Sequence, residues 1–282
     1  MDKMIETNGI TLHAVDHPGG EPTLVYLPGL TANAHLFDGV LAAGIGGKYR
    51  VLALDLRGRG LSDKPENAYT MDDHAKDVLG VLDAEGIDKA ILVGHSFGGL
   101  LSMFFAATYP ERVEHIVIID ASKASTHPRV AEMIKPALAR LGQTLPSVDA
   151  YLAAMQQAPY LHGMWNSALE AYFRADMNVN EDGTAQAHST PEAIGAAIDG
   201  IVALDWDTIV PNVQCPAILL NATEPYGGAS SPPLVSEADA RETAVLIPNC
   251  QYKHMPGNHV TMVFGDNAKF VADAIIEFIK NE

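Results

Sequence analysis

The residue best placed to do chemistry is a serine flanked by glycines. Ser96 stands within Gly94-His95-Ser96-Phe97-Gly98, after an apolar run and before a stretch rich in Leu, Met, Phe and Ala. A Gly-x-Ser-x-Gly segment between a strand and a helix makes a sharp turn that holds the serine hydroxyl clear of the sheet. The helix N-terminus adds the positive end of its dipole. We therefore predict that Ser96 is a nucleophile, rather than part of a turn that only packs.

A serine hydroxyl is a weak nucleophile without a general base. Among the 11 histidines, His259 stands in a loop, Met255-Pro256-Gly257-Asn258-His259, between the last predicted strand and the last predicted helix. Such a loop lies over the carboxyl ends of the strands, which is also where Ser96 is expected. His254 is close in sequence but lies on the other side of Pro256-Gly257. We predict His259 as the base.

The imidazole also needs a carboxylate that orients it and stabilises its charged form. Asp120 ends a predicted strand, 24 residues after Ser96 (120 − 96). Glu224 follows another predicted strand, in Asn221-Ala222-Thr223-Glu224-Pro225. A strand-ending Asp often caps the next loop, and a loop Glu is often only solvated. Position alone therefore leaves both candidates open.

A serine nucleophile further needs donors for the negative charge that develops on the substrate oxygen. Pro28-Gly29-Leu30 follows a predicted strand, and Gly29 lets this loop approach a ligand closely. The backbone N–H groups of Leu30 and Phe97 are therefore the candidate oxyanion-hole donors. Loss of one such donor typically raises the barrier by about 2.7–4 kcal/mol.

The sequence predicts a scaffold of parallel strands joined by crossover helices. Short β-branched runs alternate with longer segments of helical period, which is typical of α/β proteins. Strands are predicted at 10–15, 23–27, 50–54, 90–94, 113–119, 217–221 and 244–247. Helices are predicted at 71–85, between a cap at Thr70 and a stop at Gly86, and at 266–280, with Phe270, Ala274, Ile275 and Phe278 on one face.

From Ala121 to about Val210 the strand pattern disappears, and prolines break the stretch into helical pieces. We predict that residues 121–210 form a helical cap, inserted into a core domain made of residues 1–120 and 211–282. The cap carries aromatic and Met side chains, of which we expect one or two to contact a ligand: Met133, Tyr151, Met155, Tyr160, Met164, Trp165, Tyr172 and Phe173.

Composition limits the partners. The chain has 282 residues, 48% of them hydrophobic, and 18 Lys+Arg against 35 Asp+Glu give a net charge of −17. This is a globular composition whose charge repels nucleic acids and anionic membranes. Residues 97–107, the most apolar stretch, are too few for a bilayer span of about 20 residues. Cys215 and Cys250 make no disulfide framework or metal motif, and no targeting segment is visible. We expect a cytoplasmic protein that acts on a small molecule without cofactor or metal.

In order and spacing, four segments together resemble the α/β-hydrolase superfamily: Pro28-Gly29, Asp55-Leu56-Arg57-Gly58-Arg59-Gly60-Leu61-Ser62, Gly94-His95-Ser96-Phe97-Gly98-Gly99 and Gly257-Asn258-His259. The resemblance covers nearly the whole chain and is weakest at 121–210. It implies a mostly parallel, eight-stranded sheet with helices on both faces, an inserted helical cap and a Ser-His-acid site. In that family the 55–62 segment is mainly structural.

The resemblance also bears on the acid. Most members of the superfamily place it after the penultimate strand, in a Gly-x-x-Asp turn, but here Ala222 replaces the Gly and Pro225 the Asp, with Glu224 one residue early. Some branches, including haloalkane dehalogenases and certain ring-fragment hydrolases of vitamin catabolism, place the acid after the preceding strand. Asp120 matches that placement, so the resemblance favours Asp120 over Glu224.

The resemblance implies a serine hydrolase, and we expect a carboxylesterase for small or medium esters that works through an acyl-enzyme. Haloalkane dehalogenases and epoxide hydrolases of this superfamily have Asp at the position of Ser96, so their aspartyl ester is not available here. Hydrolysis of an amide, a lactone or a C–C bond stays open as an alternative. So does a ligand receptor with residual turnover.

The charge of the cap suggests one feature of the substrate. Residues 121–175 hold five basic side chains against three acidic ones, a net charge of 5 − 3 = +2; the basic ones are Lys123, Arg129, Lys135, Arg140 and Arg174. A basic patch above the site would favour a substrate that bears a carboxylate. A solvated basic face is the alternative.

Overall fold

The core of the fold is an eight-stranded, mostly parallel sheet. The computed structural model describes residues 1–161 and 163–282, and its main sheet has the strand order β1-β2-β4-β3-β5-β6-β10-β11. The pairs β1–β2 and β2–β4 are antiparallel, and the other pairs are parallel. This confirms the predicted α/β sheet. The strands are β1 (Asp2–Thr7), β2 (Ile10–His17), β3 (Gly20–Leu27), β4 (Tyr49–Leu54), β5 (Ala90–His95), β6 (Val113–Ile119), β10 (Ala217–Ala222) and β11 (Cys250–Met255).

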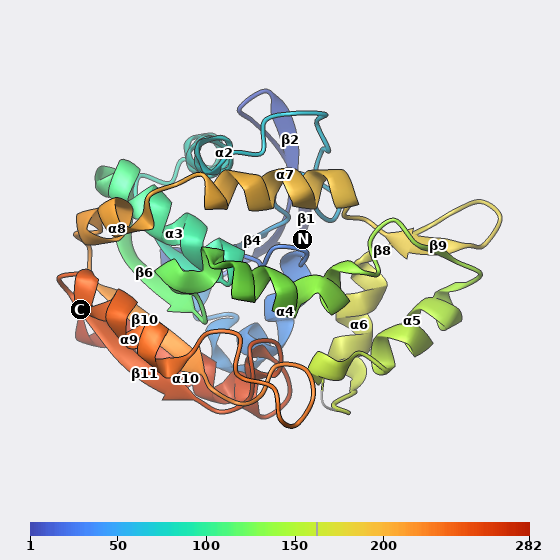
Figure 1. The fold of residues 1–282 in the computed structure, drawn as a ribbon. Coiled ribbons are helices and arrows are strands. Elements are labelled where there is room, and N and C mark those ends of the chain that lie inside the picture. The colour runs from blue at the N-terminus through green and yellow to red at the C-terminus, as the bar shows by residue number, and fades with distance from the viewer. Residues whose placement is uncertain (162) are drawn as a thin grey trace.

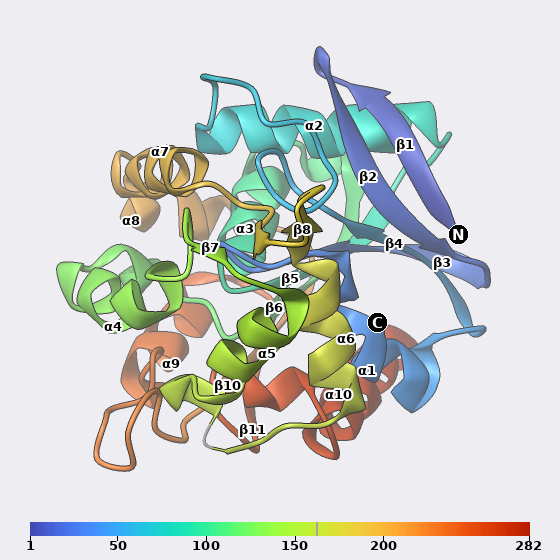
Figure 2. The ribbon, with the colours of Figure 1, turned by 90° about the vertical axis from the view of Figure 1, so that its right-hand side faces the viewer.

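Helices cover both faces of this sheet (Figures 1 and 2). One hydrophobic cluster joins the sheet to α2 (Met71–Ala84), α3 (Phe97–Thr108), α8 (Trp206–Ile209) and α9 (Glu237–Leu246). The other joins it to α1 (Asp38–Val40) and α10 (Asn267–Asn281). Strands between two helical layers bury both faces, and residues 24–27 of β3 are accordingly fully buried. That is why the central strands show no polar alternation in the sequence.

The two edge strands differ from the sequence prediction. The predicted strand at 244–247 is wrong, because most of it is the last turn of α9, and the final strand is instead β11. β1 was not predicted at all. Both strands pair on one side only, and three of the six residues in each are exposed. Lys253 and His254 of β11 point to solvent, so the apolar run that marks the central strands is missing from its sequence.

Residues 121–210 lie between β6 and β10. They form mainly helices, as predicted: α4 (Pro128–Leu138), α5 (Val148–Gln156), α6 (Ser167–Ala175) and α7 (Pro191–Val202). They also hold a small antiparallel sheet, in the order β7-β9-β8, which was not predicted. Its strands, β7 (Thr144–Leu145), β8 (Met177–Val179) and β9 (Ala185–Ala187), have two or three residues each. Strands this short leave no periodicity in the sequence.

Two helices allow the predicted helix cap and the predicted buried face to be compared with the structure. α2 begins after Thr70, whose hydroxyl accepts a hydrogen bond from Asp73 N while the Asp73 carboxylate accepts one from Thr70 N, as a capping box requires. α10 keeps Ala274, Ile275 and Phe278 buried, but Phe270 is 56% exposed and Val271 takes its place on the buried face. The prediction for Phe270 was one position out.

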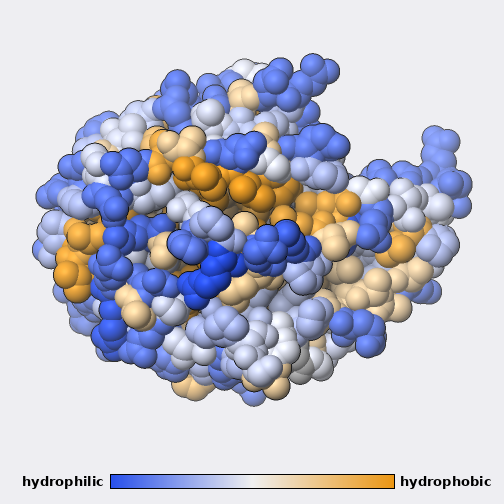
Figure 3. Space-filling model, in the orientation of Figure 1, coloured by the Kyte–Doolittle hydropathy of each residue, from blue (hydrophilic) through white to orange (hydrophobic). Residues whose placement is uncertain are grey.

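The surface seen in Figure 3 carries a band of hydrophobic side chains in the hollow between α7 and α4. Val202, in the last turn of α7, is 57% exposed.

None of the helices in the described ranges has the length and apolar character needed to cross a bilayer.

Two glycines, both inside helices, test how tightly the Ser96 turn is packed. A Cβ on Gly98 would lie 1.9 Å from the carbonyl oxygen of Leu27, whereas a Cβ on Gly195 of α7 would meet nothing within 4 Å. We expect Gly98→Ala to lower the free energy of unfolding by roughly 3 kcal/mol, and Gly195→Ala to raise it by up to about 1 kcal/mol. Urea unfolding of both variants measures this. Equal effects would show that the turn tolerates a side chain.

Candidate active site

Ser96 occupies the turn between β5 and α3 as its only residue. Its backbone has φ 54° and ψ −114°, a conformation that residues other than glycine rarely adopt. The turn is held in place because Ser96 N donates to the carbonyl of Ile119 at 2.9 Å, and Ser96 O accepts from Gly99 N at 2.9 Å. The sharp bend predicted from the glycines is therefore present, and it places Ser96 on the wall of a cavity.

The predicted base and the preferred acid meet in the structure. His259 Nδ1 lies 2.7 Å from Asp120 Oδ2, across 139 residues of sequence, and both side chains are buried. Asp120 follows β6 with a positive φ of 49°, which Asp tolerates better than most residues. The contact requires a proton on Nδ1 of the neutral imidazole, which leaves the lone pair on Nε2.

The second oxygen of the Asp120 carboxylate is satisfied from the neighbouring strand. Oδ1 accepts from Asn221 Nδ2 at 2.8 Å and from Ala222 N at 2.9 Å. The Tyr252 hydroxyl donates to Asn221 Oδ1 at 3.0 Å, which identifies the other amide atom as Nδ2, the donor to Asp120 and to the carbonyl of Val235. The carboxylate is therefore fully buried with each oxygen hydrogen-bonded.

Glu224, the alternative acid, has a different contact. Its Oε1 accepts from Gly257 N at 3.1 Å, and its own N donates to Gly257 O at 3.2 Å. Glu224 thus binds the backbone of the loop that carries His259, and Asp120 is the carboxylate on the imidazole itself. The structure brings together the acid that the resemblance favoured.

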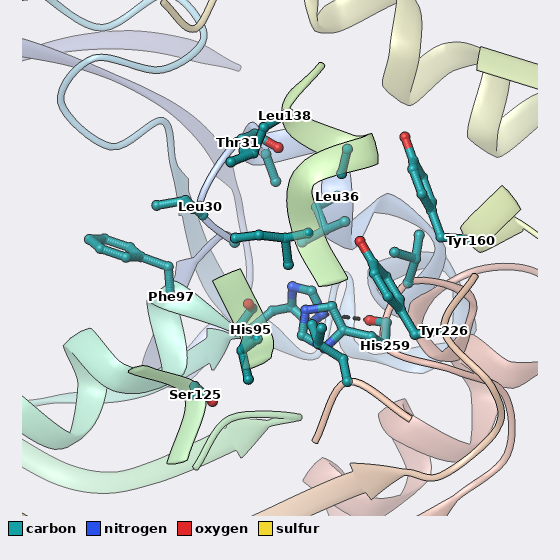
Figure 4. A pocket seen from close by; sticks show the side chains of 18 of the residues that line it. Leu30, Thr31, Leu36, His95, Phe97, Ser125, Leu138, Tyr160, Tyr226 and His259 are labelled. Carbon is teal, nitrogen blue, oxygen red and sulfur yellow. Dashed lines mark hydrogen bonds between the residues drawn. The ribbon is translucent and has the colours of Figure 1, made fainter. Parts of the chain in front are cut away.

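Two rings flank His259. His95 donates its Nε2–H to the carbonyl of His259 at 2.7 Å, the bond dashed in Figure 4, and the two ring centroids are 4.7 Å apart. Burial, with the adjacent His259 as a second cause, lowers the pKa of His95 to about 3, so His95 is neutral. Tyr226 packs edge-on against His259 at 5.8 Å and stacks on Tyr160. These contacts restrict the imidazole to one position.

The candidate oxyanion donors line the same cavity. Leu30 and Phe97 lie on one side of it in Figure 4. Among the hydrogen bonds of the described residues, neither Leu30 N nor Phe97 N has an acceptor, so both N–H groups are available to a ligand. The loop packs closely here, since a Cβ on Gly29 would lie 3.1 Å from Nδ1 of His95.

The cavity that contains these groups has a volume of about 130 Å³ and a mostly apolar lining. Leu30, Phe97 and His259 come from the sheet side, and α4 contributes Val130, Ile134 and Leu138. Of the aromatic and Met residues predicted from 121–210, three line the cavity: Tyr160, Tyr172 and Phe173. The others that the structure buries, such as Tyr151 and Met155, pack in the hydrophobic cluster.

Ser96 and His259 both face this cavity, but the hydrogen bonds of the described residues do not include one between Ser96 Oγ and His259 Nε2. In ligand-free enzymes such hydrogen bonds are often long and tighten only when a substrate is bound. The buried contact with Asp120 fixes the His259 ring, whereas Ser96 Oγ has no hydrogen bond among the described residues.

The five basic residues of 121–175 do not form a free patch. Lys123 pairs with Asp207 and Glu242, Arg129 with Asp239, Lys135 with Glu132 and Arg174 with Glu170. Only Arg140 lines the cavity, where its Nη1 lies 3.0 Å from Asp176 Oδ2 and its Nη2 donates to Thr31 O and Oγ1. Of the five predicted basic residues, Arg140 is therefore the one left as a candidate to bind a substrate carboxylate.

Three residues near the site were not predicted: His95, Asn221 and Tyr226. Asn221 had a usable signal, because it ends the strand next to the one that Asp120 follows, and such positions face one edge of the sheet. His95 is within the serine segment itself. Tyr226 has no such signal, because it lies in an irregular loop after β10.

The fold and this site define an α/β protein with a serine at a strand–helix turn. Residues 22–192 match the family described as alpha/beta hydrolase fold. This match covers more than half of the chain, and the chain belongs to that family.

Individual relatives are less complete matches. The chain is 32% identical over 160 residues to 2-(acetamidomethylene)succinate hydrolase of Mesorhizobium japonicum, covering 54% of this chain and 55% of the relative. It is 34% identical over 128 residues to Epoxide hydrolase 2 of Siraitia grosvenorii, covering 45% and 40%. The chain thus spans about half the length of these relatives. A crystal structure of E-2-(acetamidomethylene)succinate hydrolase superposes with a TM-score of 0.85 at 24% identity, covering 99% of each chain, which shows the shared fold.

The two carboxylates can be ranked by isosteric amides. We expect Asp120→Asn to lower kcat about 10⁴-fold, because the amide favours the wrong imidazole tautomer. Glu224→Gln keeps a carbonyl acceptor for Gly257 N and should change kcat by less than about fivefold. Steady-state kinetics with an activated ester measures both variants. The reverse ranking would assign the acid to Glu224.

Proposed function

We propose that this protein is a serine hydrolase that cleaves a small carboxylic acid derivative through an acyl-enzyme. Ser96 Oγ attacks the carbonyl carbon while His259 Nε2 accepts the hydroxyl proton. The tetrahedral intermediate expels its leaving group, which takes that proton from His259. Water, deprotonated by His259, then attacks the acyl carbon and releases the acid and free Ser96. Water is the second substrate, so the reaction needs no cofactor.

The buried contact between His259 Nδ1 and Asp120 Oδ2 is the observation that carries this proposal. It supports a base whose free Nε2 lone pair faces the cavity where Ser96 lies. The imidazolium that forms during the reaction gains from a carboxylate in a low-dielectric site. A structural histidine would not need a buried, fully hydrogen-bonded carboxylate beside a strained serine.

For the oxyanion we propose Leu30 N and Phe97 N as donors. Both N–H groups lack an acceptor among the described residues, and both residues line the cavity. Phe97 is also the first residue of α3, so its N–H is one of the four that a helix leaves without an internal partner. Two such donors fixed in advance stabilise the negative oxygen more than they stabilise the substrate carbonyl.

The bond we propose to be cleaved is a carboxylic ester, with a substituted amide as the second candidate. A serine at the turn supports acyl transfer for either bond. We include the amide bond as a candidate because one relative is named for 2-(acetamidomethylene)succinate, which contains an acetamido group. The small, mostly apolar cavity supports a short acyl group in both cases.

We further propose that the substrate bears a carboxylate that binds near Arg140. Arg140 is 8% exposed and lines the cavity. Its Nη1 lies 3.0 Å from Asp176 Oδ2 and its Nη2 binds Thr31, so a ligand carboxylate would share the guanidinium with these groups. The succinate in the name of the relative above is a dicarboxylate, which is consistent with an acidic substrate class.

The acyl-enzyme is tested by pre-steady-state kinetics. With a p-nitrophenyl ester we expect a burst of one nitrophenolate per protein and continued turnover, and a fluorophosphonate should label Ser96 alone. Ser96→Ala should remain folded by circular dichroism and lose both. A burst with almost no turnover would instead indicate a ligand receptor. A wild-type protein that does not react with the phosphonate would contradict the hydrolase proposal.

The acidic substrate is tested by comparing two arginines of the 121–210 segment. We expect Arg140→Met to raise KM for a hemisuccinate ester at least tenfold and to change KM for the matching neutral ester less than about twofold. Arg174→Met is the control, since Arg174 pairs with Glu170 on the surface, and it should leave both KM values unchanged. Equal effects of Arg140→Met on the two esters would contradict carboxylate binding.

A further inference from the structure

Two arginines of the 55–62 segment are both buried. They stand two positions apart in the sequence but differ in their partners. Arg57 is 2% exposed and forms a two-pronged ion pair with Asp77, from Nε at 2.6 Å and from Nη2 at 2.5 Å. Arg59 is fully buried, yet among the described residues no carboxylate lies within the 4.0 Å of an ion pair. A buried charge without a counter-charge is costly and uncommon.

Neutral groups surround the Arg59 guanidinium. Its Nη1 donates to the carbonyl of Arg57 at 2.6 Å and to His74 Nε2 at 3.1 Å, while Nη2 is buried without an acceptor. His74 donates its own Nδ1–H to Thr70 O at 2.9 Å, so its Nε2 must be an acceptor and the ring is neutral. Burial and the Arg59 charge hold the pKa of His74 well below its ordinary value.

The remaining contacts of Arg59 are with the two candidate oxyanion residues. Its Nε donates to the carbonyl of Leu30 at 2.9 Å. Its guanidinium carbon lies 5.0 Å from the ring centroid of Phe97, within cation–π distance. His74 packs edge-on against the same ring at 4.9 Å. Leu30 and Phe97 line the cavity and Arg59 does not. Arg59 therefore contacts both residues from outside the cavity.

We propose that Arg59 is a positioning residue for the oxyanion hole, and that its uncompensated positive charge stabilises the oxyanion through Leu30 and Phe97. This inference rests on the serine hydrolase function proposed above. The hydrogen bond to Leu30 O fixes the loop that presents Leu30 N. The contact with the Phe97 ring fixes the first residue of α3.

The missing carboxylate partner is what gives the charge an effect on the reaction. A counter-charge such as Asp77 cancels most of the field of Arg57 at a distance. The field of Arg59 reaches the neighbouring cavity through apolar and peptide groups, where the effective dielectric is low. A fixed positive charge of this kind favours the anionic intermediate over the neutral carbonyl substrate. Burial lowers the pKa of Arg59 to about 9, which leaves it charged at neutral pH.

Two variants of Arg59 separate charge from packing. We expect Arg59→Gln, which removes the charge, to lower kcat about 10- to 100-fold with KM within about twofold. Arg59→Lys keeps a basic group but loses the planar fork, and burial lowers the pKa of a lysine at this position. It should therefore lower kcat, by a smaller factor than Arg59→Gln. All rates are normalised to the burst amplitude, so that only folded, reactive protein is counted.

A second measurement reports the anionic state directly. An arylboronic acid forms a tetrahedral, negatively charged adduct on a serine, and its Ki should rise in Arg59→Gln by the same factor as kcat falls. Arg57→Lys is the control: it disturbs an equally buried arginine of the same segment that contacts neither Leu30 nor Phe97, so it should lower stability and leave kcat unchanged.

The outcomes are distinct. An unchanged kcat and boronate Ki in Arg59→Gln would overturn the role of Arg59. Equal losses of kcat in Arg59→Gln, Arg59→Lys and Arg57→Lys would also overturn it, because they would indicate a packing role only. If Arg59→Gln does not fold, Arg59→Lys decides. A partial loss of kcat matched by an equal rise in the boronate Ki supports the role of Arg59, whereas an unchanged kcat and Ki, or a loss equal to that of Arg57→Lys, overturns it. A wild-type protein without a burst would overturn the proposed function and this inference together, before any variant is compared.

Discussion

The burial of one carboxylate determines the geometry of the candidate site. Asp120 is fully buried, and a carboxylate out of water must be satisfied by protein donors. Those donors come from two parts of the chain: Asn221 and Ala222 at the end of β10, and His259 from the loop after β11. Satisfying Asp120 therefore requires β6, β10 and the His259 loop to be in register. The parallel pairing of β6 with β10, and of β10 with β11, supplies that register.

Each functional group is held by contacts to backbone as well as to side chains, which makes the site stiff. Ser96 N binds Ile119 O, the residue just before Asp120, so the serine turn is tied to the end of β6. The carbonyl of His259 is held by His95, which adjoins Ser96. Serine, base and acid are thus linked through neighbours as well as through the proposed reaction. Such a preorganised arrangement reduces the reorganisation needed when charge develops.

The sequence predicted the parts of the site that follow from local motifs, and missed those that depend on packing. Ser96 and His259 could be found because the turn and the loop each have a local pattern. Asp120 and Glu224 could not be separated by position alone, because both follow strands whose carboxyl ends lie at the same edge, β6 and β10 being neighbours. Counting charges in 121–175 predicted a basic patch, yet four of the five side chains pair with acids. Two of these acids lie outside the counted segment, and two lie one helical turn from their basic partners. Arg59 lies in a segment regarded as structural, and its missing partner is visible only in three dimensions.

One loop connects the proposed carboxylate contact of Arg140 with the proposed oxyanion donor Leu30 N. The carbonyl of Leu30 accepts from Arg59 on the sheet side at 2.9 Å, and the carbonyl of the next residue, Thr31, accepts from Arg140 of the 121–210 segment at 3.2 Å. The loop that presents Leu30 N is thus clamped between two buried guanidinium groups. Only Arg140 has a counter-charge, Asp176, and only Arg140 lines the cavity. A ligand carboxylate that reaches Arg140 would therefore share the group that positions the oxyanion loop. A guanidinium held by more acceptors is less free to move. Under these proposals, a substrate carboxylate that binds Arg140 would therefore also restrict the loop that presents Leu30 N.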